Sequence, residues 1–522
     1  MQKLLLQPDW DAIPKENGVQ IYSLQEESSP VLLTGKKLAQ LFSDLITGIT
    51  ETELLRKYPT KDNARLLKRL KKMGAVRVGE MARKNSSESN YLDLLANNTI
   101  GPGKIVRQII QCAISHDNPF FGKFHVSYSA GFAPRLITHQ SSLSGGWGAD
   151  TDGLLADIKS VVEAVERYAL AEYDEKLLIK ASWEQVKNKT LTATQMGASE
   201  KILESTPNIL WGQLEGVNTD EKLLAPLDFL HHPVDYESLK RYPIAPLNIS
   251  GVAAHQSMDA AITNGLLELC EHEALILAWY GQRKTPNINP KSLDQDSQEH
   301  IERLEKMGWK VILKDISLDL TPVVMAVALG PVGKRALTIG SCAAFSARYA
   351  ARKALTEVIR TILVDEATSP TFPAIAHSEV NDVLTHGLHY ARHENLAEVE
   401  DLWIGSEQVD AIDLLTDGTG RTLKEVQDLW ESQGKLVEKE KEYMANILKS
   451  RGIRAYYSEI TPKEIKEAGI PLFAVRTLAP EMTRMTVGNS RIPAQTKRFN
   501  LLLQNYANKM PHDILDRLHP FS

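Results

Sequence analysis

The chain has 522 residues, of which 43% are hydrophobic and 24% are charged, and its formal net charge is −6. This length is too great for one hydrophobic core and predicts several domains, while the composition is that of a soluble globular protein. The acidic balance argues against a dedicated nucleic-acid-binding protein, which carries a basic excess.

The three cysteines, Cys112, Cys270 and Cys342, are far apart and show no paired spacing. Neither a disulfide framework nor a cysteine zinc site is therefore expected, and a reducing cytoplasm is the default location. No stretch approaches the roughly 20 apolar residues that cross a bilayer. The short apolar run at the start of the chain is too short for a signal peptide. We expect a cytoplasmic protein without a membrane partner.

Residues 1–90 are predicted to form a small module of their own, because the polar run at 83–90 is the best linker candidate. The expected strands are 19–24, 30–35 and 75–80, and the expected helices are 36–48, a short helix from Thr50, and 62–74. This order is winged-helix-like. Three roles stay open: a peptide clamp, a structural addition, or a DNA-binding module that uses the basic residues Lys68, Arg69, Lys71 and Lys72.

Residues 91–522 alternate strands and helices, which predicts a mixed α/β or α+β fold with helices covering β-sheets. The expected strands are 123–131, 309–317, 322–329, 336–342, 453–460 and 471–478. Three helices in this region carry charged residues in patterns that point to chemistry.

The first of these helices is predicted over 152–177. Glu163 and Glu166 are three residues apart and therefore lie on one face, next to the apolar stripe of the helix. An ordinary surface ion pair between Lys159 and Glu163 is the alternative interpretation.

The second helix, predicted over 258–281, is apolar almost all the way round and should be buried. Glu268 and Glu271 nevertheless stand in its middle, and two buried carboxylates must be protonated, salt-bridged or bound to metal. We predict a divalent cation, with salt bridges to distant arginines as the alternative. Mg²⁺ prefers a few carboxylates together with substrate phosphates. His272 either hydrogen-bonds the carboxylate pair or has a packing role.

The third helix is predicted over 342–363. Arg348 and Arg352 are four residues apart, share a face with the neighbourhood of Glu357, and are followed by Arg360. Guanidinium groups match phosphate oxygens geometrically. A charged outer side of an amphipathic helix is the alternative.

A glycine-rich run, Ser144-Gly-Gly-Trp-Gly, precedes the first helix and is expected to be a flexible turn whose amides cradle a phosphate. Trp147 either stacks on a nucleobase or packs within the protein. His386, His389 and His393 are expected to belong to a polar helix or turn rather than to a metal site.

Taken in this order, the three segments resemble the YcaO family, and the resemblance covers roughly residues 125–522. The family has a glycine-rich turn and an E-x-x-E-R helix, then an NGLxExxERD helix, then an AlxEaxQ helix. The residues that match these motifs are Glu163, Glu166, Arg167, Asn264, Gly265, Glu268, Glu271 and Glu357.

The resemblance implies a YcaO fold and an enzyme that uses ATP and Mg²⁺ to phosphorylate an amide oxygen of a substrate peptide. This phosphorylation follows attack on the amide by a Cys, Ser or Thr side chain or another nucleophile, and loss of phosphate then gives an azoline. The implied metal ligands are Glu163, Glu166, Glu268 and Glu271. The implied cofactor-binding residues are Ser144, Gly146, Gly148, Arg167, Asn264, Arg348, Arg352 and Glu357. The implied catalytic groups are Glu357 and the terminal carboxylate at Ser522.

Several positions depart from the family pattern. Trp147 replaces the lysine of the turn, His272 and Glu273 replace Arg and Asp, and Arg360 replaces Gln. The ending at His519-Pro-Phe-Ser lacks a full proline-rich repeat. Two alternatives to a cyclodehydratase follow: a catalytically altered scaffold subunit, and a YcaO enzyme that makes thioamides or amidines.

The implied substrate is a ribosomally made precursor peptide with a leader segment. A leader can be bound as an added β-strand by the amino-terminal module or by an E1-like or leader-binding partner protein. A homodimer is the open alternative for the assembly, and nucleic acid is not an expected partner.

Overall fold

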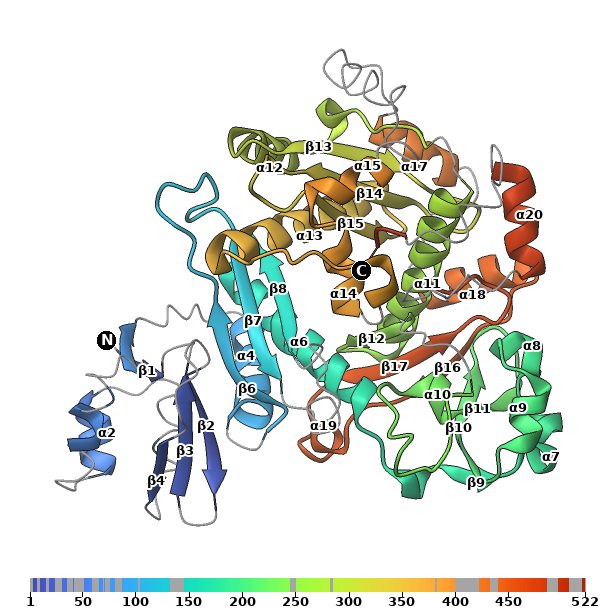
Figure 1. Cartoon of the computed structure of the whole chain (residues 1–522), viewed down its shortest axis with the longest axis horizontal. Coiled ribbons are helices and arrows are strands. Elements are labelled where there is room, and N and C mark those ends of the chain that lie inside the picture. The colour runs from blue at the N-terminus through green and yellow to red at the C-terminus, as the bar shows by residue number, and fades with distance from the viewer. Residues whose placement is uncertain are drawn as a thin grey trace. The chain divides into compact units, whose positions relative to one another are not determined.

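The computed structural model describes residues 3–6, 10–15, 18–23, 31–34, 41, 51–58, 65–68, 70, 76–79, 87–101, 104–131, 145–244, 250–281, 285–380, 383–399, 422–431, 440–485, 496–506 and 519–521. It divides into two compact units (Figure 1). The first unit comprises described residues within 1–112, 124–168 and 462–470, and the second those within 113–123, 169–461 and 471–522.

The amino-terminal part of the first unit contains two antiparallel sheets and a short helix. β1 (Lys3–Leu6) pairs with β5 (Val76–Gly79), and β2 (Trp10–Lys15), β3 (Gly18–Ser23) and β4 (Val31–Thr34) form a three-stranded sheet. α2 spans Glu51–Lys57, and residues 65–68 and Leu70 are helical. The three predicted strands and the helix from Thr50 are therefore confirmed. β1 and β2 were not predicted.

The missed strand β2 contains Pro14, which weakens a strand signal and is tolerated at a sheet edge. Of the helix predicted over 36–48, only Leu41 lies within the described residues, and it is helical. Residues 87–90, expected as linker, begin α4 (Ser87–Thr99). The winged-helix assignment and the boundary at residue 90 stay predictions.

The rest of the first unit is a three-stranded antiparallel sheet with helices. β6 (Val106–Gln111), β7 (His125–Gly131) and β8 (Gly146–Asp150) pair in chain order, followed by α6 (Gly153–Ala171), and α19 spans Lys463–Glu467. Of the run predicted as a flexible glycine turn, Gly146, Trp147 and Gly148 thus lie in strand β8. A Cβ on Gly148 would lie 1.9 Å from the carbonyl oxygen of Ala156, so glycine here permits direct strand–helix contact.

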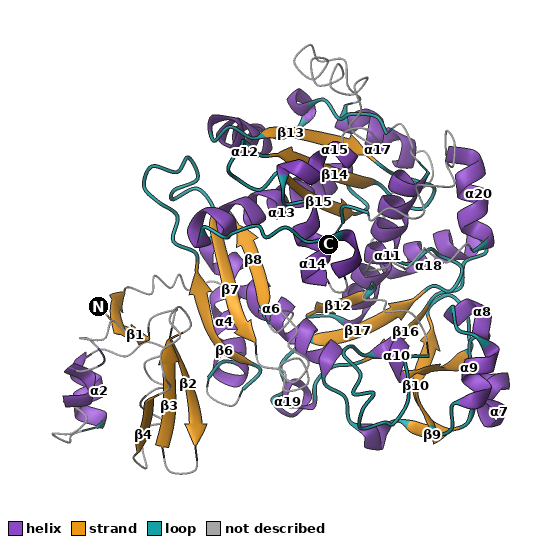
Figure 2. Ribbon diagram, viewed as in Figure 1, coloured by secondary structure: helices purple, strands orange, loops and turns teal. Residues whose placement is uncertain are grey.

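The second unit contains a larger sheet in the order β11-β10-β16-β17-β12, with β9 beside β10, and all its pairs are antiparallel. Its strands are β9 (Ile179–Ala181), β10 (Ile209–Gly216), β11 (Lys222–Pro226), β12 (Val252–His255), β16 (Tyr456–Glu459) and β17 (Phe473–Leu478). The short helices near it are α7 (Trp183–Val186), α8 (Ala193–Met196), α9 (Glu200–Ser205) and α10 (Leu227–Leu230). Figure 2 shows these elements.

The same unit contains a second sheet, the antiparallel β13-β14-β15, and the long helix α11 (Met258–Tyr280). The strands are β13 (Lys310–Asp315), β14 (Val323–Leu329) and β15 (Leu337–Ala343). The remaining helices are α12 (Gln295–Lys306), α13 (Ala347–Thr368), α14 (Val383–His389), α15 (His393–Val399), α17 (Leu423–Glu431), α18 (Glu440–Ser450) and α20 (Lys497–Tyr506). All six strands predicted beyond residue 91 are confirmed.

The three chemistry-bearing helices are also confirmed, with shifted ends. α6 stops at Ala171 rather than at residue 177, and α13 begins at Ala347 rather than at residue 342. Residues 342 and 343 continue β15 instead, because Ala343 still pairs with Val323 of β14.

The core of the second unit surrounds α11, whose apolar residues are almost all buried. One fully buried carboxylate, Glu273, lies within this core. It accepts hydrogen bonds from Arg498 of α20 at 2.9 Å and from the Thr483 N–H at 3.0 Å, and Arg498 also binds Asp319. A buried charge of this kind is tolerated only when it is paired, and this network fixes α20 to α11.

Among the described residues, no helix combines the length and the apolarity needed to span a membrane.

The close approach of α13 to β15 depends on Gly340. A Cβ at this position would lie 2.3 Å from the carbonyl oxygen of Ala354 and 2.9 Å from Cβ of Glu357. We predict that Gly340→Ala lowers the free energy of unfolding by about 1–3 kcal/mol, because backbone atoms must move apart. Urea denaturation followed by circular dichroism measures this change.

The matched control is Gly212→Ala on strand β10. A Cβ there would first meet the flexible end of Leu230, at 2.3 Å, so a side-chain rotation relieves most of the clash. An equal loss of stability in the two variants would contradict the proposed role of Gly340.

Candidate functional site

One face of α11 stays accessible although the rest of the helix is buried. Asn264 is exposed, and Glu268, Glu271 and His272 are half-buried, four, seven and eight residues further on. This spacing places all four on one side of a helix. Glu268 and Glu271, which were expected as carboxylates of a buried helix, are therefore half-buried. Glu273 is the buried carboxylate, and the accessible pair lines a polar face.

Glu268 is held by the turn that precedes β12. Its Oε2 accepts the N–H of Gly251 at 3.1 Å. Gly251 has φ of +85°, and a Cβ there would lie 2.5 Å from the carbonyl oxygen of Thr477, so both conformation and space require glycine. Gly265 of α11 likewise leaves room for the Thr477 side chain. These contacts lock α11 against β17 and fix Glu268 at the junction.

A fully buried arginine of β17 provides the positive charge near Glu268. Arg476 donates from Nε to the carbonyl oxygen of Phe229 at 2.9 Å. Burial lowers the pKa of Arg476 to about 10, and the Glu268 carboxylate opposes that shift. The guanidinium therefore stays charged at neutral pH.

His272 is held apart from the carboxylate pair. Its Nδ1 lies 2.6 Å from Ser250 Oγ, whereas its Nε2 is 3.8 Å from Glu268 Oε1. Burial and the charge of Arg476 lower the pKa of His272 to about 4. The imidazole is therefore neutral at pH 7 and cannot replace the charge of an arginine.

Glu271 is bound by the edge strand β15. Ser341 Oγ donates to its Oε1 at 2.5 Å, and the Ala343 N–H donates to its Oε2 at 3.1 Å. Burial and the nearby charge of Glu357 raise the pKa of Glu271 to about 7, and these hydrogen bonds oppose the rise.

Glu357 of α13 reaches the same strand. Its Oε2 accepts the Ser341 N–H at 3.4 Å, and its Oε1 lies 3.7 Å from Lys353 Nζ. Burial disfavours the charge of Lys353, but Glu357 acts together with Cys342 and Tyr349, and the pKa of this lysine is raised. Sequence reasoning missed Lys353, although its position four residues before Glu357 on a helix is a recognisable signal.

The predicted arginines of α13 lie nearer the surface. Arg348 and Arg352 are exposed, and the Arg352 guanidinium lies 5.6 Å from the ring centroid of Tyr349. Arg360 is half-buried.

In the first unit, Glu163 accepts the backbone N–H of Trp147 at 3.0 Å and binds Arg167 at 3.2 Å. Lys159 pairs with Asp150 at 2.5 Å, so the ion pair proposed between Lys159 and Glu163 is not formed. Glu166 is half-buried three residues after Glu163. The indole of Trp147 lies against Tyr128, with ring centroids 4.5 Å apart.

Glu163 and Glu357 are bound in the same way in the two units. In each case, the donor is a backbone N–H of the third strand of a three-stranded sheet, namely Trp147 in β8 and Ser341 in β15. In each case, the acceptor is a glutamate 16 residues further on, in the helix that follows.

A glycine immediately precedes the donor in both units. A Cβ on Gly146 would lie 2.2 Å from Ser160 O, and one on Gly340 would lie 2.3 Å from Ala354 O, in both cases the carbonyl fourteen residues further on. The pairs β8–α6 and β15–α13 therefore pack in the same way, with a strand glycine in contact with the helix backbone. This contact brings a helix against an edge strand and places a glutamate at that edge.

The carboxylate set fits a hard cation in its chemistry. Glu271 and Glu357 converge on Ser341, and burial together with the charge of Glu357 raises the pKa of Glu271. Carboxylate oxygens are the ligands that Mg²⁺ takes. Within the described ranges, no three His, Cys, Asp or Glu side chains are already grouped to hold a metal ion. Ser144 and Ser522 lie outside the described residues.

The histidines predicted to lie outside a metal site bind backbone carbonyls. His386 and His389 lie in α14, and their ring nitrogens are 2.6 Å from His519 O and 3.1 Å from Ile375 O. His393 begins α15 and lies 3.1 Å from Pro331 O. Of the three, His386 is the one that joins α14 to His519.

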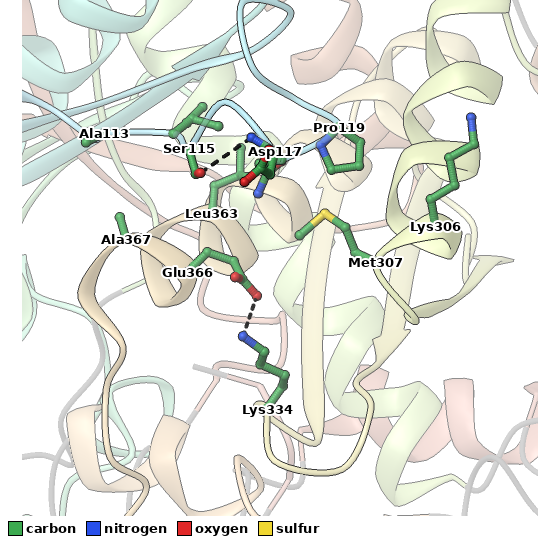
Figure 3. Close-up of a pocket in the computed structure, with 12 residues that line it drawn as sticks. Ala113, Ser115, Asp117, Pro119, Lys306, Met307, Lys334, Leu363, Glu366 and Ala367 are labelled. Atoms are coloured by element: carbon green, nitrogen blue, oxygen red, sulfur yellow. Dashed lines mark hydrogen bonds and ion pairs between the residues drawn. The ribbon is translucent and has the colours of Figure 1, made fainter.

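A pocket of about 540 Å³ lies elsewhere in the second unit, between the 113–119 segment, the end of α12 and the end of α13 (Figure 3). Across it, Lys334 pairs with Glu366 at 3.0 Å. None of the residues predicted for the site lines this pocket. The candidate site is therefore the carboxylate face and not this pocket.

Comparison with known proteins places these residues in a family context. Residues 147–483 match the model of one family, the YcaO cyclodehydratases, described as ATP- and Mg²⁺-binding. All predicted site residues except Ser144, Gly146 and Ser522 lie within this segment. No curated protein matches the sequence.

Three solved structures share the fold. A heterocyclase in complex with substrate and cofactor has 15% identity and a TM-score of 0.58, over 90% of this chain and 60% of that chain. YcaO from Methanopyrus kandleri, bound with AMPPCP and Mg²⁺, has 16% identity and a TM-score of 0.52, over 77% of this chain and 92% of that one. The E. coli microcin synthetase McbBCD complex with pro-MccB17 has 13% identity and a TM-score of 0.52, over 79% and 96%.

At these identities the likeness establishes the fold, and it confirms the predicted mixed architecture of helices and antiparallel sheets. The chain spans 60% of the length of the heterocyclase.

The raised pKa of Glu271 predicts a pH-dependent stability in metal-free protein. The folded state keeps this proton up to about pH 7, whereas an unfolded chain releases it near ~4.3. The unfolded state therefore binds fewer protons in this window, and the free energy of unfolding falls as the pH rises. Between about pH 5 and pH 8, the free energy of unfolding of Glu271→Gln should therefore rise relative to that of the wild type by about 1–2 kcal/mol. Urea denaturation measures this difference.

Glu357→Gln provides the internal check, because it removes the neighbouring charge and should flatten the same profile. Parallel stability curves for the wild type and both variants would show that Glu271 does not titrate in this range.

Proposed function

Because this chain belongs to the YcaO family, which is matched by residues 147–483, we propose that it is an ATP- and Mg²⁺-dependent enzyme that activates backbone amides of a peptide. The family binds ATP and Mg²⁺, and a structure with the same fold carries AMPPCP and Mg²⁺. One observation in the chain supports this best: Glu271 and Glu357, from two different helices, converge on one edge strand.

The residues proposed to hold Mg²⁺ are Glu163, Glu166, Glu268 and Glu271. Those proposed for the nucleotide are Gly146, Gly148, Arg167, Asn264, Arg348, Arg352 and Glu357, together with Ser144, and the structure adds Lys353. Bound ATP would supply the phosphoryl group that turns a poorly leaving amide oxygen into a good leaving group.

The chain's own residues orient and charge this site. The Gly251 N–H binds the Glu268 carboxylate in the middle of α11, and the charge of Arg476 acts on the same carboxylate. Lys353 is a half-buried cation next to Glu357, in a position to offset negative charge that enters the site. These groups are set by packing before any ligand arrives, which is what electrostatic preorganisation requires.

The finer proposal is cyclodehydration. A Cys, Ser or Thr side chain of a ribosomally made precursor attacks the preceding amide, and loss of the activated oxygen gives an azoline. Glu357 and Ser522 are the proposed catalytic residues. The family description as cyclodehydratases and the heterocyclase with the same fold support this reaction over thioamide or amidine formation.

A second candidate function is a scaffold subunit that no longer turns over ATP. One observation favours it: His272 stands where the family has arginine, and it is half-buried and neutral. Magnesium-dependent nucleotide binding separates the two functions, because a scaffold needs none.

The proposed partner is the leader of the precursor peptide. The sheet β2-β3-β4 of the amino-terminal module has β2 and β4 at its edges among the described strands. Such an edge can accept an extended peptide as a further strand. An E1-like or leader-binding partner protein is the alternative route for delivery, and a homodimer is an open assembly. In this proposal, residues 1–90 form the peptide-recognition module and residues 91–522 form the catalytic domain.

We predict that Glu268→Gln weakens Mg²⁺-dependent binding of a non-hydrolysable ATP analogue by more than about tenfold, because it removes a charged metal ligand. Isothermal titration calorimetry with and without Mg²⁺ measures this loss. Glu299→Gln is the matched control, since Glu299 forms a surface pair with Arg303 on α12.

Equal affinity in Glu268→Gln and the wild type would refute the assignment of Glu268 as a ligand. No Mg²⁺-dependent binding by the wild type would favour the scaffold.

A further inference from the structure

Ser341 is in contact with two carboxylates that come from two helices. Its hydroxyl donates to Glu271 of α11 at 2.5 Å, and its N–H donates to Glu357 of α13 at 3.4 Å. The two acceptors are 86 residues apart in the sequence, and Ser341 lies on the strand between their helices. Only one-twelfth of its surface is exposed, at 8%, so water does not readily replace these bonds.

The first unit provides an internal comparison for this position. Its equivalent residue is Trp147, whose N–H alone binds Glu163. The backbone bond from strand to helix glutamate is therefore common to both units and needs no particular side chain. The Ser341 hydroxyl makes a further hydrogen bond that the first unit lacks at Trp147, and this bond connects β15 to Glu271 of α11.

All four carboxylate oxygens of the pair are directed by neighbours. Ser341 Oγ and the Ala343 N–H take the two oxygens of Glu271, and the Ser341 N–H and Lys353 approach the two oxygens of Glu357. Without the hydroxyl, one oxygen of Glu271 loses this partner in a half-buried site, and the Ala343 N–H is left to orient the carboxylate.

We propose that Ser341 is a positioning residue, whose hydroxyl fixes the orientation of Glu271 relative to Glu357 for cation binding. This inference rests on the proposed function. Groups that orient a metal ligand from behind commonly contribute about 10–100-fold to metal affinity, although they do not touch the ion.

Ser341→Ala tests the proposal in the full-length chain. The probe is AMPPCP, titrated calorimetrically at a series of Mg²⁺ concentrations. We expect the Mg²⁺ concentration for half-maximal binding to rise about tenfold. Binding of AMPPCP without Mg²⁺ should not change, and a purely structural role would not produce this split.

Thr338→Val is the matched control. Thr338 lies on the same strand and is buried, and its hydroxyl has no hydrogen-bond partner among the described residues. Valine keeps its shape, so this variant should retain wild-type Mg²⁺ dependence. A second measurement uses Glu271→Gln: adding Ser341→Ala to it should cause little further loss, because the two residues act through one contact.

The outcomes are distinct. Wild-type Mg²⁺ dependence in Ser341→Ala overturns the proposal, as does an equal loss in Thr338→Val, which would indicate a general effect on the strand. Additive losses in the double variant also overturn it. If the wild type shows no Mg²⁺-dependent binding, the proposed function fails and this inference fails with it.

Discussion

The candidate site depends on how closely a helix can lie against an edge strand. Gly146 and Gly340 carry no Cβ, so α6 and α13 touch the backbone of β8 and β15. At that distance a glutamate 16 residues after the donor reaches a backbone N–H of the edge strand. An edge N–H needs an acceptor and a half-buried carboxylate needs a donor, so each satisfies the other. The position of the carboxylate is thus a consequence of backbone packing.

The acidic residues of α11 have different partners on the two sides of the helix. Glu273 faces the core and is neutralised by Arg498, which makes it part of the folded structure. Glu268 and Glu271 face the accessible side and are held mainly by N–H and O–H donors, with Arg476 nearby. Dipolar donors fix an orientation without cancelling the charge. The face therefore retains negative charge that a cation can use, at the cost of a raised pKa for Glu271.

The sequence predicted most helices and strands, and it placed the candidate glutamates on helices that the structure contains. Helices, strands and the two glutamate pairs follow from local periodicity, which needs no knowledge of distant residues. The glycine run was expected as a turn, because its role is packing against Ala156 and cannot be seen locally. The partners Ser341 and Arg498 were missed because they lie 70 and 225 residues from the glutamates they bind. Lys353 was within reach, since it is a helical neighbour of Glu357.

The four candidate glutamates match the family pattern, and the departures from it concern residues next to them. His272 is neutral and bound to Ser250, so the helix has lost a positive charge next to Glu268. That charge is nevertheless present, because Arg476 acts on Glu268 from β17, 208 residues further along the chain. Trp147 likewise loses a lysine side chain but keeps the backbone N–H that holds Glu163. A site that depended on the family's lysine and arginine at positions 147 and 272 would be lost. A site that depends on backbone N–H donors and on Arg476 of β17 keeps its geometry. This favours a working ATP site over a scaffold.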